Sequence, residues 1–324
     1  MPSSTDCSCA AVEPRVQSRP SIVLLMGPTG AGKSDLALEL AQQLPAEIVS
    51  VDSAMVYRGL DIGTAKPPPE VRERIPHHLV DLLDPAESYS AGRFVQDALE
   101  AIRAIHARGR TPLLAGGTML YFHALLNGLA RLPAANAAIR SELESRLAAE
   151  GSAALHAELR RVDPEAAARI HPNDPQRIQR ALEVHRLTGR PISVLQRERP
   201  THLTGIRAGR FVVSPPREEL HARIARRFEQ MMAAGFVEEV RSLRARADLT
   251  ADMPAMRAVG YRQLWQHLEG ITSLEEAVRR GIVATRRLAK RQLTWLRALP
   301  QAEWLKAPAD SVERVSAWLA GEGE

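Results

Sequence analysis

Short, uniformly apolar runs alternate with amphipathic stretches through the first part of the chain. Residues 21–26 (SIVLLM), 47–51 (EIVSV) and 111–115 (TPLLA) have the length and composition of buried parallel strands. Between them, residues 33–44 and 94–108 repeat apolar side chains at helical spacing. This alternation predicts an α/β fold, in which helices flank a parallel sheet and ligands bind at the carboxyl ends of the strands.

The pattern changes along the rest of the chain. Residues 53–90 are rich in glycine and proline breakers, and residues 131–205 contain helical stretches only. Residues 211–213 return to the strand pattern, and helical spacing follows at 217–234, 236–246, 258–268 and 273–299. We predict a disordered N-terminal tail (1–20) and a core made of residues 21–130 and 206–305. An all-helical insert (131–205) interrupts the core. The core ends in a helical C-terminal region, and a C-terminal segment (306–324) follows it.

Composition narrows the class of protein. The chain has 324 residues and a formal net charge of +5, with a pI near 9.6, which suits a nucleic-acid partner but equally suits simple solubility. The two cysteines, Cys7 and Cys9, are too close for a mutual disulfide and too few for a zinc site. No apolar run approaches the roughly 18 residues of a membrane span, and no leader pattern begins the chain, so we expect a cytoplasmic protein.

A phosphate-binding loop follows the first predicted strand. Its residues fit the pattern G-x-x-x-x-G-K-[ST] and stand between a strand and a helix, which is the context this motif requires: Gly27, Pro28, Thr29, Gly30, Ala31, Gly32, Lys33 and Ser34. The backbone N–H groups can surround phosphate oxygens, Lys33 can neutralise them, and the Ser34 hydroxyl can bind Mg²⁺. The sheet is therefore expected to be a P-loop-type core that binds a diphosphate or triphosphate.

The second predicted strand ends at a carboxylate, Asp52. The third ends at Ala115-Gly116-Gly117, without the acidic residue that often holds the metal in ATP-hydrolysing P-loop enzymes. Asp52 can bind metal through water, act as a general base, or cap a helix together with Ser53. A small-molecule kinase and an RNA-binding protein with a decayed loop remain alternatives, although the loop retains all four of its defining residues.

Beyond these two features, an ordered set of segments resembles the tRNA dimethylallyltransferases (tRNA isopentenyltransferases) of bacteria over residues 22–297. The resembling segments are Asp52–Pro67, Pro76–Asp81, Tyr89-Ser90, Gly116–Tyr121, His171–Arg177, Gly260–Gln263 and Thr285–Gln292 before Trp295. The resemblance implies transfer of a dimethylallyl group from its diphosphate to N6 of the adenosine 3′ of the tRNA anticodon (position 37), with release of diphosphate.

The resemblance also assigns roles to individual residues. Asp52 is implied as the general base, and the P-loop with Lys33, Ser34 and Mg²⁺ as the diphosphate site. Thr118 is implied to lie beside the reacting groups. Arg227 matches a diphosphate-binding arginine, although the sequence alone does not separate it from Arg226.

The implied partners are tRNA and dimethylallyl diphosphate, and the expected state is a monomer. The target base must leave its stack to reach Asp52, while the insert clamps the anticodon stem. Met55 stands where many relatives have Gln, and the sequence assigns no role to His77 and His78. The implied tRNA contacts are Asp52, Ser53, Ala54, Met55, Gln176, Arg177, Ile178, Gln179, Arg180, Arg257, Gly260, Tyr261, Arg262, Lys290, Arg291, Gln292, Trp295 and Arg297.

Overall fold

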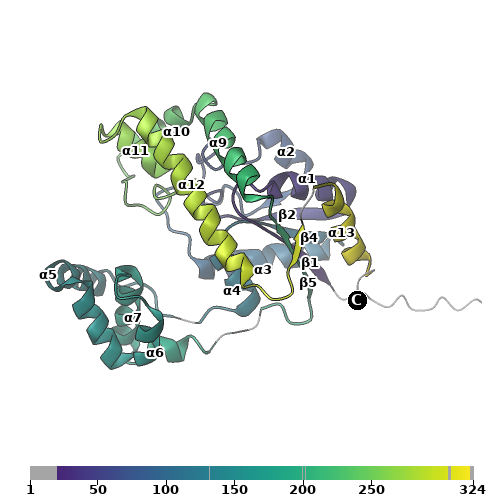
Figure 1. The fold of residues 1–324 in the computed structure, drawn as a ribbon. Helices are drawn as coiled ribbons and strands as arrows, with labels where there is room; N and C mark the ends of the chain where they lie inside the picture. The colour runs from purple at the N-terminus through teal and green to yellow at the C-terminus, as the bar shows by residue number, and fades with distance from the viewer. Residues whose placement is uncertain (1–19, 131, 199, 201, 306–307, 322–324) are drawn as a thin grey trace, which may run out of the picture.

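A parallel sheet forms the centre of the molecule in the computed structural model, which describes residues 20–130, 132–198, 200, 202–305 and 308–321 (Figure 1). Its six strands run in the order β3-β2-β4-β1-β5-β6, and every pair is parallel, as the sequence predicted. Their bounds are β1 Ser21–Met26, β2 Ala46–Val51, β3 His77–His78, β4 Thr111–Gly116, β5 Arg207–Val213 and β6 Glu303–Leu305. The predicted disordered tail, apart from residue 20, lies outside the described residues, as do Cys7 and Cys9.

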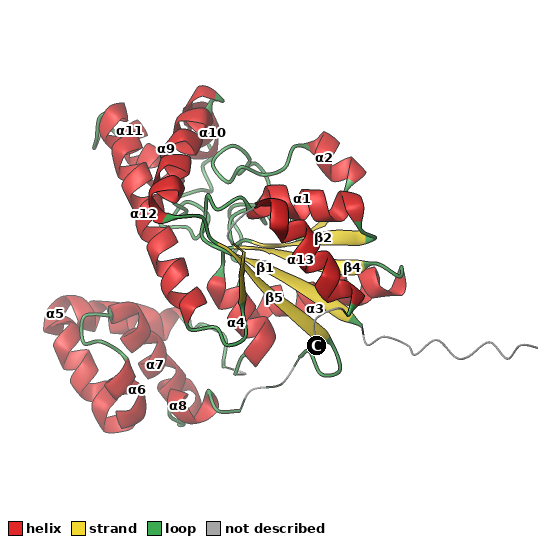
Figure 2. Cartoon of the chain, turned by 45° about the vertical axis from the view of Figure 1, so that its right-hand side comes forward, coloured by secondary structure: helices red, strands yellow, loops and turns green. Residues whose placement is uncertain are grey.

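Helices cover both faces of the sheet (Figure 2). Side chains that alternate along the strands form an apolar layer under each set of helices. Leu24 and Met26 face helices α3 (Ala91–Ala107) and α4 (Met119–Asn127), whereas Val23 and Leu25 face α1 (Lys33–Gln43) and α13 (Pro308–Ala320). Since successive side chains of a strand point to opposite sides, a strand with both faces covered is apolar throughout. The predicted layer of helices on each side of the sheet is thus confirmed.

Four elements were not predicted. The glycine- and proline-rich segment contains helix α2 (Pro69–Arg74) and the edge strand β3, and the C-terminal segment supplies strand β6 and helix α13. Two- and three-residue strands carry too little alternation to be recognised locally. They form because a neighbouring strand is already present: β3 pairs with Ile48 and Val49, and β6 pairs with β5.

Four helices from the C-terminal half pack over a second apolar core. They are α9 (Arg217–Ala233), α10 (Phe236–Arg244), α11 (Tyr261–Leu268) and α12 (Leu274–Arg297). The rings of Phe236 and Tyr261 meet edge-on with centroids 4.9 Å apart. Val56 and Leu60, from the loop after β2, are buried in the same cluster. These helices are therefore joined to the loops at the carboxyl end of the sheet.

The helical insert has an apolar core of its own. It comprises α5 (Ala137–Val162), α6 (Pro164–Arg169), α7 (Pro175–Thr188) and α8 (Ile192–Leu195), so the prediction that this stretch is helical is confirmed. Gly151, with φ of 81°, breaks α5 into two parts. Glu183 is fully buried but accepts hydrogen bonds from Arg140 and Arg180. In Figures 1 and 2 the insert stands apart from the sheet, near the C-terminal end of α12.

Among the described residues, no helix combines the length and apolar character required to cross a membrane.

Candidate active site at the carboxyl end of the sheet

The phosphate-binding loop turns tightly between β1 and α1. Gly30 and Gly32 have φ of 80° and 94°, which glycine adopts without strain, so the backbone can curl around an anion. The Ala31 N–H donates to the Pro28 carbonyl, and Lys33 Nζ reaches back to that same oxygen at 2.7 Å. Helix α1 begins at Lys33, which directs its unpaired N–H groups and the positive end of its dipole toward the loop.

The register of the sheet brings two further loops beside this one. Gly116, the last residue of β4, pairs with Met26 of β1 on one side and with Val51 of β2 on the other. The segments that follow these three residues must therefore start as neighbours. Thr118 ties two of them together, because its Oγ1 accepts a hydrogen bond from the Ser53 N–H at 3.1 Å.

Gln292 of α12 braces the phosphate loop against the loop after β4. Its Oε1 accepts from the Thr29 N–H at 2.9 Å, and its Nε2 donates to the Gly117 carbonyl at 2.7 Å. A Cβ on Gly117 would lie only 2.5 Å from that Nε2, so glycine is needed for the approach. Gln292 was predicted as a tRNA contact. Its side chain lines the central cavity but is 8% exposed, with both ends of its amide engaged inside the protein, and its contact with tRNA stays a prediction.

Asp52 both caps a turn and lines the cavity. Its Oδ1 accepts hydrogen bonds from the N–H groups of Ala54 at 2.8 Å and Met55 at 3.3 Å. The local role considered from the sequence is therefore present, although it caps a turn and not a helix. The same carboxylate lines the central cavity, close enough to the charges of Lys33 and Arg227 to interact with both. A carboxylate held by two N–H groups has a fixed direction.

Two cations face this cavity. Burial, followed by repulsion from Arg227, lowers the pKa of Lys33 to about 7, although Asp52 opposes the shift. Burial also lowers the pKa of Arg227, whose NH2 donates to the Thr64 carbonyl at 3.1 Å. Arg226 is exposed and does not line the cavity, so the structure separates the two arginines that the sequence could not. Two desolvated positive groups in one cavity favour a multiply charged anion.

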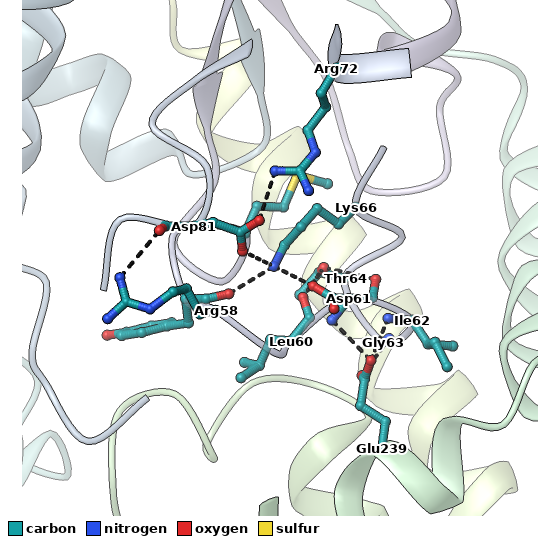
Figure 3. A network of polar contacts seen from close by, with 12 residues as sticks. Arg58, Leu60, Asp61, Ile62, Gly63, Thr64, Lys66, Arg72, Asp81 and Glu239 are labelled. Atoms are coloured by element: carbon teal, nitrogen blue, oxygen red, sulfur yellow. Dashed lines mark hydrogen bonds and ion pairs between the residues drawn. The ribbon is translucent and has the colours of Figure 1, made fainter. Parts of the chain in front are cut away.

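The loop that carries Thr64 is held by the polar network of Figure 3. The carboxylate of Glu239 accepts from the N–H groups of Asp61, Ile62 and Gly63 at 2.7–3.1 Å, and from the Tyr261 hydroxyl at 2.6 Å. Glu239 therefore positions the backbone that orients Arg227. It was not predicted from the sequence, because the loop and the helix lie about 176–178 residues apart.

A buried lysine secures the other end of this loop. Lys66 donates to Asp61 and to Asp81, each at 2.6 Å, and to the Tyr57 carbonyl at 2.8 Å. Burial alone would raise the pKa of Asp81, but hydrogen bonds from Lys66 and Arg72 lower it. The lysine is thus compensated on three sides, as a buried charge must be.

The central cavity has a volume of about 510 Å³ and two kinds of wall. The polar wall comprises the phosphate loop, Asp52, Thr118 and Arg227. Apolar side chains form the other wall, namely Met119, Leu120, Ile224, Phe228, Met231, Val259, Leu288 and Trp295. Leu120 and Trp295 of this wall are 51% and 44% exposed, so they remain accessible to a ligand.

Family comparisons agree with this arrangement. The IPP transferase model matches residues 55–299, and the isopentenyl transferase model matches residues 20–77. The chain belongs to the IPP transferase family. Among its similar relatives, the tRNA dimethylallyltransferase of Halorhodospira halophila is 58% identical over 290 residues, covering 89% of this chain and 93% of that protein. The tRNA dimethylallyltransferase of Alkalilimnicola ehrlichii is 56% identical over 312 residues, which cover 95% of this chain and 98% of that protein.

Solved structures of IPP transferases share the fold. The tRNA isopentenylpyrophosphate transferase of Bacillus halodurans has a TM-score of 0.67 at 36% identity, covering 94% of this chain and 96% of that one. A second similar structure is that of a eukaryotic dimethylallyltransferase, solved in snapshots of its action on tRNA. Its TM-score is 0.80 at 26% identity, and the match covers 93% of this chain and 80% of that one.

The tRNA contacts predicted from the IPP transferase resemblance fall in three places. Asp52, Ser53, Ala54, Met55, Arg257, Arg291 and Trp295 line the central cavity. Gln176 and Arg177 are exposed at the start of α7 in the insert, with Gln179 and Arg180 partly buried behind them. Lys290 and Arg297 line a separate cleft beside α12. Arg262 is exposed and lines neither opening, and Gly260 is buried, its N–H donating to Gln263.

Two of these residues have buried side chains. A tRNA contact is wrong for the side chain of Ile178, whereas Tyr261 also lines the central cavity and its contact stays a prediction. Ile178 is 0% exposed within the core of the insert, so it cannot contact RNA there. Tyr261 is also 0% exposed, and its hydroxyl is engaged by Glu239. Both were included because they lie within contiguous motifs, but on a helix only some residues of a contiguous run face outward.

The two histidines of β3 lie outside the central cavity. His77 Nδ1 lies 2.7 Å from the Ile75 carbonyl, and His78 Nε2 lies 2.7 Å from the carboxylate of Glu47 on β2. Neither lines the cavity. The contacts of these two histidines hold the edge strand β3 and the residues before it. Their role in this structure, which the sequence did not assign, is therefore a structural one.

Proposed function

We propose that this chain transfers a dimethylallyl group from dimethylallyl diphosphate to N6 of the adenosine 3′ of a tRNA anticodon. One observation carries the proposal: a single cavity joins a phosphate-binding loop, two desolvated cations and a fixed carboxylate to an apolar wall. A short apolar group linked to a diphosphate matches the two kinds of wall. The names of the relatives supply the acceptor, because they are called tRNA dimethylallyltransferases.

The chemistry then requires three tasks of the protein. The bond between C1 of the dimethylallyl group and the diphosphate oxygen breaks as N6 forms a bond to C1. Charge grows on the departing diphosphate, and loop N–H groups, Lys33 and Arg227 stabilise it. The amine loses one proton, and Asp52 accepts it. Thr118, through its bond to the Ser53 N–H, holds the loop of Asp52 next to these groups.

The oxygen donors in the cavity fit a magnesium ion shared with the diphosphate. Ser34 offers a hydroxyl, while the described residues contain no group of three or more His, Cys, Asp or Glu side chains arranged to hold a metal by themselves. Mg²⁺ commonly uses few protein ligands and completes its shell with phosphate oxygens and water. When bound, it would neutralise charge on the leaving group, and Ser34 would be its protein ligand.

The test is a direct assay of the reaction. Purified protein is incubated with dimethylallyl diphosphate, Mg²⁺ and unmodified tRNA, and the digested nucleosides are analysed by mass spectrometry. Dimethylallyl adenosine that is absent when either substrate is omitted supports the proposal. A folded protein that binds tRNA but forms no product, or that turns over ATP instead, contradicts it.

A further inference from the structure

A second cleft, of about 360 Å³, lies between α9 and α12, and we call it the α9–α12 cleft. Its charged and titratable lining residues are Arg217, His221, Arg286, Arg287, Lys290 and Arg297. Its other lining residues are four apolar side chains and one threonine, with no acidic residue. Five permanent cations around one depression create a strong positive potential.

Helix α12 separates this cleft from the central cavity. Leu288, Gln292 and Trp295 line the cavity, whereas the basic residues Arg286, Lys290 and Arg297 line the cleft. At 3.6 residues per turn these two sets lie on roughly opposite faces of the helix. The cleft is therefore distinct from the site where the diphosphate is held.

The cations of the cleft are uncompensated within the part of the chain that the structure describes. None of the five forms an ion pair there. Three other arginines of the same two helices do form ion pairs: Arg223 with Glu219, and Arg279 and Arg280 with Glu276. The five unpaired cations of the cleft thus lie on the second half of α12 and at the start of α9.

Arg286 connects the two helices that line the cleft. Its NH2 donates to the His221 carbonyl at 3.3 Å, which joins α12 to α9, while its buried Nε has no hydrogen-bond partner. Burial, Arg286 and Arg217 together lower the pKa of His221, which reports the same excess of positive charge. A group of cations without an acidic neighbour in the lining favours a ligand that carries negative charge.

We propose that the α9–α12 cleft binds the phosphodiester backbone of the tRNA substrate, with Arg217 and Arg286 as contacts in addition to Lys290 and Arg297. This rests on the proposed function. From Arg286 to Arg297 the helix rises by eleven residue steps, or about 16 Å at 1.5 Å per residue. A single small anion would neutralise only one end of such a row, whereas a polyanion matches its length.

The experiment removes the two arginines that only this proposal assigns to tRNA. The variant Arg217→Gln/Arg286→Gln is compared with Arg279→Gln/Arg280→Gln, a control that removes two charges from the ion-paired part of α12. Dissociation constants for tRNA are measured over a series of NaCl concentrations, alongside steady-state kinetics. Loss of two phosphate contacts should reduce the salt slope by about 1.4–1.8 and raise the Kd about tenfold at low salt. Saturating tRNA should restore kcat, with the KM for dimethylallyl diphosphate unchanged, and the control should match wild type.

Three outcomes overturn the inference. The first is a salt slope equal to that of the control. The second is a fall in kcat at saturating tRNA without a change in affinity. The third is weaker binding of inorganic diphosphate with tRNA affinity intact, which would make the cleft a small-anion site. If Arg286→Gln destabilises the fold, exposed Arg217→Gln alone should still reduce the slope by about 0.7–0.9. Because binding is measured without turnover, a wild type that bound tRNA but formed no product would refute only the proposed function.

Discussion

Glu239→Gln tests whether a residue outside the cavity controls the cation inside it. In the wild type, Oε2 accepts from the Asp61 and Ile62 N–H groups, and Oε1 accepts from the Gly63 N–H and the Tyr261 hydroxyl. Glutamine offers one oxygen and one NH2. If the oxygen stays with Asp61 and Ile62, the Tyr261 hydroxyl can rotate to accept from the NH2, but the Gly63 N–H loses its acceptor.

The expected cost follows from these four contacts. Hydrogen bonds to a charged acceptor contribute about 1.5–3 kcal/mol each against about 1 kcal/mol for neutral ones, and an orphaned donor costs about 1–3 kcal/mol. Allowing for relaxation, the free energy of unfolding should fall by about 2–4 kcal/mol. Because Thr64 follows Gly63 and its carbonyl holds Arg227, the KM for dimethylallyl diphosphate should rise and kcat should fall, each by about tenfold, or about 1.4 kcal/mol.

Urea denaturation and steady-state kinetics check the two parts separately. The matched control is Glu238→Gln, because that neighbouring carboxylate pairs with Arg241 on the exposed surface and its loss should leave the stability close to that of the wild type. Tyr261→Phe removes only one of the four donors and should have a smaller effect than Glu239→Gln. If Glu239→Gln keeps both wild-type stability and wild-type KM, the loop does not depend on this carboxylate and the reasoning is wrong.

Three further predictions concern the cavity itself. Asp52→Asn should lower turnover by about 10²–10⁴ with tRNA affinity within a few-fold, as followed by single-turnover product formation; full activity would remove Asp52 from the role of base. Because the pKa of Lys33 is lowered to about 7, the free protein holds that lysine mostly uncharged at pH 8, and a bound diphosphate should raise the pKa. Binding of the diphosphate at pH 8 should then take up as much as about one proton, and the affinity should fall as pH rises. Calorimetry in buffers of different ionisation enthalpy measures this proton uptake. Equal uptake by the Lys33→Met variant would contradict the prediction. Gln292→Ala leaves the Thr29 N–H and the Gly117 carbonyl without their partner, and should raise the KM for dimethylallyl diphosphate about tenfold. The control is Gln263→Ala, which removes another buried glutamine, one that caps α11. It should leave this KM within a few-fold of the wild-type value.

Local sequence accounts for the parts of the site that have a local cause. The phosphate loop was predicted because its glycines and lysine act within eight residues, and Asp52 because it ends an apolar strand. Arg227 could be separated from Arg226 only by the packing of α9, which exposes one and turns the other into the cavity. Glu239 and Gln292 act across distances of more than 170 residues, so their contacts depend on tertiary structure alone.

The C-terminal elements show a different limit. Strand β6 has three residues, too few for a pattern, and exists because β5 offers a free edge. Helix α1 covers only part of one face of the sheet, and α13 covers more of the same face. Val315 of α13 is buried there among residues of α1 and β5. The place of each segment in the fold is therefore set by the surface that it covers.

Helix α12 connects the central cavity with the α9–α12 cleft. The same 24-residue rod supplies the amide that braces the phosphate loop, a wall of the cavity, and the cations of the α9–α12 cleft. A shift of the helix that accompanied filling of one site would alter the other, since a packed helix moves as a unit. Any coupling free energy carried in this way is reciprocal, so the factor by which dimethylallyl diphosphate changed the affinity for tRNA would equal the factor by which tRNA changed the affinity for dimethylallyl diphosphate.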